Sequence, residues 1–208
     1  MAVTQGKPSG GGPFFGATPP AYITGNRYPS PYVYSPDTTT LTTTATRLYY
    51  VLTYVWEARS FQGCATHNSG AGDNGDTYRT GIYTHSATNG PTTLLHQFGE
   101  VTLTGAASER LQSSSFSVTT PGFYWLAFHA NQAAAMARQR ATTYQESGAG
   151  YGPPVWTPAF AGFVASPWAQ VTTMGIIRSV DTAYGSLAST AVAPTTDQDF
   201  GPLISLRP

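Results

Sequence analysis

The chain has 208 residues, and its ten basic side chains are balanced by ten acidic ones. Only 10% of the residues are charged, against about 25% in ordinary soluble domains. The balance leaves no broad positive field to attract nucleic acid or an anionic membrane, so we predict neither a nucleic-acid partner nor membrane insertion. This length suits one domain with appendages, and the abundant Gly, Pro, Thr, Ser and Tyr favour strands and turns over helices.

The N-terminus lacks the apolar core of a secretion signal, and the longest apolar run, residues 48–56, is far too short for a membrane span. We therefore expect synthesis in a cytoplasm without a signal peptide. So little charge is poorly suited to a free soluble protein, which favours permanent assembly. The sole cysteine, Cys64, is expected to be a small buried side chain, and no Cys/His spacing predicts a metal or cofactor site.

Residues 1–46 are rich in Gly, Pro and Tyr. Prolines at this density prevent a helix and hinder regular strand pairing, while the aromatic rings still need a surface on which to bury area. We predict an extended arm that anchors the chain on a partner, with a disordered leader as the alternative, mostly for residues 1–13. The predicted assembly residues are Phe14, Phe15, Tyr22, Arg27, Tyr28, Tyr32 and Tyr34.

From residue 41 onward, apolar segments punctuated by turn residues are typical of a sandwich or barrel. The segment 133–140 fits a helical turn or a strand about equally well. The other predicted strands are 47–56, 59–67, 77–85, 92–103 with a break at Gly99, 111–118, 121–130, 171–177 and 203–206.

The strand at 121–130 is apolar on both faces, because Tyr124, Leu126 and Phe128 alternate with Phe123, Trp125 and Ala127. Such a strand belongs in the middle of a sheet with both sides covered. One cover should be a second sheet. The other should be a long loop, the N-terminal arm or another subunit.

The segment 144–168 carries aromatic and polar residues without a regular period, and long segments of this kind are usually functional or packed on partners. Sugar rings stack on Trp and Tyr, while amide and carboxylate groups bind their hydroxyls. One interpretation is therefore a glycan-binding loop, and the other is that its rings pack over the strand at 121–130 or into a neighbouring subunit. The candidate glycan-binding residues are Tyr144, Gln145, Glu146, Tyr151 and Trp156.

Catalytic patterns are weak. No Gly-x-Ser-x-Gly elbow accompanies the four histidines, and the acidic pair in residues 73–76 fits a hairpin turn better than a calcium loop. The sequence separations of Glu100, Glu109 and Glu146 neither support nor exclude a glycosidase pair. We predict a non-enzymatic protein without catalytic or metal-binding residues.

Four motifs recur in a familiar order: YITGNRY at 22–28, RLYYV at 47–51, RTGIY at 79–83 followed by NGP at 89–91, and PGFYWLA at 121–127. This ordered set, covering roughly residues 20 to 140, resembles a jelly-roll domain found in virion proteins of tailed bacteriophages and related gene-transfer particles: tail fibres, tail tips, head fibres and spikes. The resemblance implies an antiparallel two-sheet β-sandwich of the jelly-roll type, part of a virion and without catalytic machinery.

We therefore expect an all-β chain in which residues 1–46 form the anchoring arm and residues 47–208 form the jelly-roll sandwich. The expected function is that of a structural virion protein, either a head-fibre or decoration subunit or a tail-fibre or tail-tip subunit. Its expected partners are other virion proteins and copies of itself in a symmetric oligomer. The alternative is a receptor-binding adhesin that recognises host surface polysaccharide through its aromatic loops.

The adhesin alternative predicts that Trp156→Ala weakens binding to the glycans that the intact protein retains, because the substitution removes a stacking surface. A glycan array probed with both proteins measures this. Retention of no glycan by the intact protein would exclude the adhesin alternative for the glycans tested.

Overall fold

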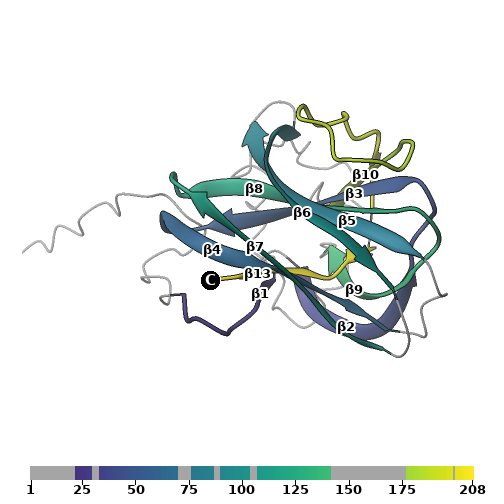
Figure 1. The fold of residues 1–208 in the computed structure, drawn as a ribbon. Coiled ribbons are helices and arrows are strands. Elements are labelled where there is room, and N and C mark those ends of the chain that lie inside the picture. The colour runs from purple at the N-terminus through teal and green to yellow at the C-terminus, as the bar shows by residue number, and fades with distance from the viewer. Residues whose placement is uncertain are drawn as a thin grey trace, which may run out of the picture.

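The computed structural model describes residues 22–29, 33–69, 76–86, 90–103, 107–141, 177–198 and 200–208. These residues contain no helix, and therefore none that could cross a membrane; they form two antiparallel sheets packed face to face (Figure 1). The predicted all-β, antiparallel two-sheet sandwich is confirmed. In chain order the strands are β1 Tyr28–Pro29, β2 Val33–Thr42, β3 Arg47–Val55, β4 Arg59–Asn68, β5 Thr77–Ser86, β6 Gly90–Thr102, β7 Ser108–Val118, β8 Gly122–Ala130, β9 Ala135–Ala141, β10 Ile177–Asp181, β11 Thr196–Asp197, β12 Phe200–Pro202 and β13 Ile204–Arg207.

The strands from β2 to β9 pair in two sets of four. One sheet contains β2–β9–β4–β7, and the other contains β3–β8–β5–β6. Along the chain, successive strands from β2 to β9 alternate between the two sheets, except at the β5–β6 hairpin. Nearly every strand pair therefore joins segments that are distant in sequence.

The C-terminal segment completes the first sheet where two of its strands diverge. β4 and β9 pair only at Asn68 and Met136. Beyond that point β12 pairs with β9 and β13 pairs with β4, so residues 200–207 occupy the place between them. The side chains of Ile204 and Leu206 enter the core, and β1 pairs with the other edge of β13.

The predicted arm boundary at residue 46 does not fit these strands, because β1 and β2 both belong to the first sheet. Proline lacks a ladder donor and is tolerated on edge strands and at bulges. Among the described residues β2 pairs only with β9, and its register shifts between Tyr34 and Pro36. The prolines therefore placed these strands at the edge of the sheet without excluding them from it.

The other predicted strands agree with the structure within a few residues. The ambiguous segment 133–140 forms strand β9. The expected break at Gly99 is a register shift within a continuous β6, at a positive φ of 76°. The prediction for 171–177 lies outside the described residues except for Ile177, which opens β10.

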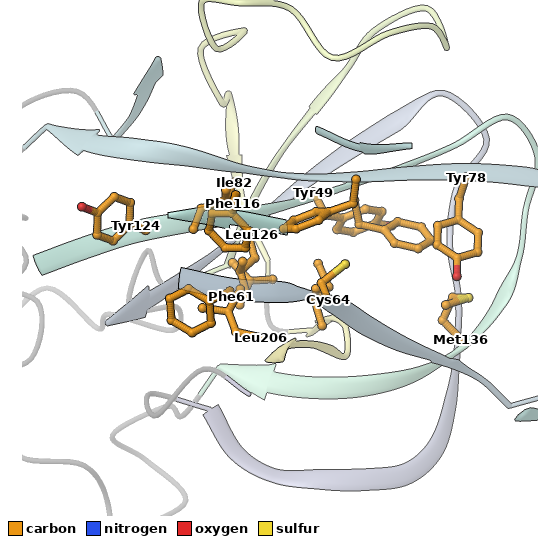
Figure 2. Close-up of a cluster of buried hydrophobic side chains, with 14 of the residues drawn as sticks. Tyr49, Phe61, Cys64, Tyr78, Ile82, Phe116, Tyr124, Leu126, Met136 and Leu206 are labelled. Carbon is orange, nitrogen blue, oxygen red and sulfur yellow. The ribbon is translucent and has the colours of Figure 1, made fainter. Parts of the chain in front are cut away.

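Both faces of β8 are covered, as predicted. Tyr124, Leu126 and Phe128 join the core between the sheets, and Figure 2 shows part of this cluster. Trp125 and Ala127 lie on the outer face of the second sheet in a separate apolar cluster. Among the described residues this outer cluster includes Leu187 from the segment 182–195, hereafter the strap; a loop thus supplies a cover here.

Cys64 is fully buried in the inner core, as predicted, and burial raises the pKa of its thiol to about 12. Its sulfur contacts the Thr80 hydroxyl at 3.1 Å and the Gln112 side-chain oxygen at 2.9 Å. At neutral pH this thiol is protonated and inert.

The β4 bulge depends on Gly63, which has a φ of 145°. A Cβ there would lie 1.9 Å from the backbone oxygen of Gln112 on β7. We predict that Gly63→Ala lowers the free energy of unfolding by about 3 kcal/mol through clash and backbone strain. Urea unfolding measures this. Gly122→Ala is the matched control, since nothing lies within 4 Å of its Cβ position; equal losses in both variants would contradict the prediction.

Candidate functional site

Three of the predicted assembly residues come together in the structure. Tyr22, Arg27 and Tyr28 lie where residues 22–29 dock on one end of the sandwich, a contact hereafter called the clasp. The backbone of Tyr34 lies in β2. The other predicted assembly residues, Phe14, Phe15 and Tyr32, lie outside the described residues, as do the glycan-binding candidates Tyr144, Gln145, Glu146, Tyr151 and Trp156.

The centre of the clasp is the ring of Tyr22, which is only 6% exposed. It stacks on Trp56, just after β3, with a centroid distance of 3.8 Å and an interplanar angle of 6°. Tyr28 and Phe61 meet it edge-on at 4.7 and 5.4 Å. Burial in this apolar box raises the pKa of the Tyr22 hydroxyl. Stacked and T-shaped aromatic pairs each contribute about 0.5–1.5 kcal/mol beyond their buried area.

A tight turn brings the two tyrosines of the clasp together. The Asn26 amide donates to the Ile23 carbonyl at 3.1 Å, and Gly25 takes a positive φ of 93°. The Ile23 amide then donates to the Tyr28 hydroxyl at 2.8 Å. Residues 22–28 thus fold back on themselves before entering β1.

Charged groups fasten the clasp from two sides. Arg59 Nη1 donates to the Tyr22 carbonyl at 3.0 Å, and its guanidinium carbon lies 5.4 Å from the centroid of the Tyr22 ring. Arg27 makes a two-pronged ion pair with Glu109 on β7, with N–O distances of 2.5 and 3.2 Å. Hydrogen bonding to Arg27 lowers the pKa of the Glu109 carboxyl. Since β13 and β4 separate β1 from β7 in the sheet, this pair spans the outer face of both strands.

The clasp is therefore an intramolecular contact, made by side chains that the sequence assigned to a partner. It fixes the point at which the chain before residue 22 meets the sandwich. Sequence reasoning missed Trp56, Arg59 and Glu109, which lie far along the chain; the one local signal was an aromatic residue ending a strand. Ile23, beside the turn, is 59% exposed.

One Ser–His contact resembles part of a nucleophilic site. His96 Nε2 lies 2.8 Å from Ser114 Oγ and so links β6 to β7. Its ring is held by Phe98 and Phe116, at centroid distances of 5.0 and 5.4 Å, and desolvation lowers its pKa. Among the described residues no carboxylate bonds to its other nitrogen, which a triad requires.

The other described histidines have separate surroundings. His85 Nδ1 accepts the indole N–H of Trp125 at 2.8 Å, His67 is exposed, and His129 is buried beneath the strap. No three His, Cys, Asp or Glu side chains gather to hold a metal ion in the described ranges.

No family model matches the sequence, and neither a curated protein nor a solved structure matches the chain.

The clasp predicts a ranking of two substitutions. Tyr22→Ala should lower the free energy of unfolding by about 2 kcal/mol, because it removes a buried ring and its stacking partners. Arg27→Ala should cost less than about 1 kcal/mol, because the paired side chains are 30% and 41% exposed. Urea unfolding of both variants tests this ranking. A larger loss from Arg27→Ala would show that the ion pair, and not the aromatic box, holds the segment.

Proposed function

We propose that the chain is a non-enzymatic structural subunit of a tailed bacteriophage or related gene-transfer particle, assembled with other virion proteins and with copies of itself. One observation carries the proposal. Three of the four motifs behind the resemblance, at 47–51, 79–83 and 121–127, lie in β3, β5 and β8, which are hydrogen-bonded neighbours. The fourth, at 22–28, docks on Trp56 at the end of β3. The motif set therefore belongs to one structural unit.

The strand order supports the jelly-roll interpretation. Jelly rolls consist of eight strands in two sheets, connected as two Greek keys. The orders β2–β9–β4–β7 and β3–β8–β5–β6 have this form. We infer that β10 to β13 and β1 are additions to that eight-stranded frame.

The distribution of charged side chains supports assembly with other subunits. Five ion pairs among the described residues each join an arginine to a carboxylate: Arg27–Glu109, Arg47–Asp181, Arg59–Glu57, Arg79–Glu100 and Arg178–Asp197. The strap, most of which is exposed, contains no charged residue. Surfaces depleted of charge are typical of the cores of protein interfaces.

The clasp refines the proposed anchoring. Because Tyr22, Arg27 and Tyr28 bind their own sandwich, we propose residues 1–21, which include Phe14 and Phe15, as the anchoring part of the arm. Deleting residues 1–34 would also remove β1 and the clasp. Removing only residues 1–21 leaves β1 and the clasp in place, so this deletion tests anchoring without removing part of the fold.

The test is incorporation into particles. In cells that produce the particle encoded with this chain, the full-length protein and a version lacking residues 1–21 are expressed separately, and particles are purified on a density gradient. We expect the full-length protein to co-purify with DNA-containing particles and the truncated one to be absent, although it unfolds at the same urea concentration.

The outcomes separate the two parts of the proposal. Absence of the full-length protein from purified particles would contradict the structural role. Equal incorporation of both versions would leave the structural role standing and exclude anchoring through residues 1–21.

A further inference from the structure

The strap, residues 182–195, covers the outer face of the second sheet mainly through its backbone. The hydroxyls of Tyr50 and Tyr83 donate to the carbonyls of Val192 and Ala188, at 3.2 and 2.9 Å. Of its side chains Leu187 is buried, and the amide of this residue donates to Gln97 Oε1 at 2.8 Å. The strap backbone also pairs with β6, where the Leu94 amide donates to the Ser189 carbonyl at 2.9 Å and the Ala191 amide donates to the Thr92 carbonyl at 2.6 Å. A cover held mainly by such directed bonds can open without disturbing the core between the sheets.

The N-terminal part of the strap is held by a polar cluster around Tyr184. Its hydroxyl donates to Glu100 Oε2 at 2.8 Å and contacts the Thr77 hydroxyl at 3.2 Å. Arg79 binds the same carboxylate at 2.9 Å, and its Nη1 donates to Ser186 Oγ at 3.3 Å. These bonds tie β5 and β6 to the strap.

His129 lies directly beneath this cluster. It is 2% exposed, and its ring centroid is 5.2 Å from that of Tyr184. Its Nε2 lies 3.3 Å from the Thr46 carbonyl, which also accepts the Thr182 amide at 2.9 Å. Opposite His129, in register on β5, stands Arg79. The imidazole thus lies beside the segment that enters the strap, on the N-terminal side of Tyr184.

The charged groups around His129 do not favour a second positive charge. β5 presents Arg79, and the strap presents the neutral Tyr184. Glu100 of β6 is already bound by Arg79 and Tyr184. On β3 the residue opposite is Leu48, and the neighbouring Arg47 is paired with Asp181 of β10. Burial, helped by Arg79, lowers the pKa of His129, although the backbone of Thr46 and Thr182 opposes this shift.

We propose that the strap is an acid-sensitive cover: protonation of His129 releases residues 182–191 and uncovers the apolar outer face of β3, β8 and β5. The imidazolium gains hydration when Tyr184 moves away, and it gains distance from Arg79 when the cluster around the strap opens. The inner core keeps its side-chain packing, because His129 belongs to the outer face.

The direction of the pH dependence follows from linkage. In the closed state the pKa of His129 is lowered, so closing is fully favourable above the ordinary histidine pKa of about 6.5 and becomes less favourable as the pH falls through it. Each unit of lowering makes opening about tenfold more favourable once the pH is below both values. The Glu100 carboxyl, whose pKa is also lowered, stays ionised in this range.

The proposal does not depend on the proposed virion role, and the purified full-length chain is enough to test it. Hydrogen–deuterium exchange, corrected for intrinsic rates, is compared at about pH 7.5 and about pH 5.5. Protection of the amides of Thr182, Leu187 and Ala191 should fall severalfold at the lower pH, up to the limit of about tenfold that one group with an open-state pKa of about 6.5 allows there, while the amides of β8 stay protected. In His129→Gln the protection of the strap should be independent of pH.

His96→Gln is the matched control, because His96 is also a desolvated histidine but links β6 to β7, away from Tyr184. It should leave the pH dependence of the strap unchanged. Equal protection of the strap at both pH values in the wild type would overturn the proposal, as would the same pH dependence in His129→Gln. If His129→Gln does not fold, an NMR titration of the wild type decides: a closed-state pKa of His129 at or above about 6.5 contradicts the device, and a lower one together with acid-induced exchange supports it.

Discussion

The structure depends on a strand that is apolar on both faces. Trp125, Leu126, Ala127 and Phe128 are each fully buried in β8, and fully burying a large apolar side chain contributes roughly 1.5–3 kcal/mol. Neither face can be left in water, so the sheet that contains β8 needs a cover on each side. The first sheet covers one side, and the strap covers part of the other.

The two covers differ in what holds them. Between the sheets, large side chains interlock around the hydrogen-bonded group of Cys64, Thr80 and Gln112, which links β5 of the second sheet to β4 and β7 of the first. On the outer face, the rings of Tyr50 and Tyr83 form part of the apolar cluster, and their hydroxyls donate hydrogen bonds to the strap backbone. Tyrosine suits this double use because one end of it is apolar and the other polar. The outer cover therefore depends more on directed hydrogen bonds than on interlocked side chains.

The strands could be predicted from sequence because alternation and turn residues are local signals. The two faces of β8 followed from the same alternation. The edge strands β1 and β2 could not be predicted in this way. Proline disfavours strands in the interior of a sheet, but it is tolerated at an edge with register shifts. The strap could not be predicted from the sequence either. Its small residues, such as Gly185, Ala188 and Ala191, follow no periodic pattern, and the strap is held largely through backbone groups that every sequence possesses.

The clasp changes what the aromatic arm indicates about function. A run of tyrosines shows that rings need apolar surface, but it does not say whose surface. Tyr22 and Tyr28 find it on Trp56 and Phe61 of their own chain, so aromatic content alone is weak evidence for a partner. Scarcity of charge is stronger evidence for assembly. Packing tyrosine rings within the same chain does not explain how a surface with so few charged residues stays soluble. The strap is largely exposed and uncharged, and the arginines near it are already paired with carboxylates. Burial of the strap between subunits would remove this uncharged surface from water.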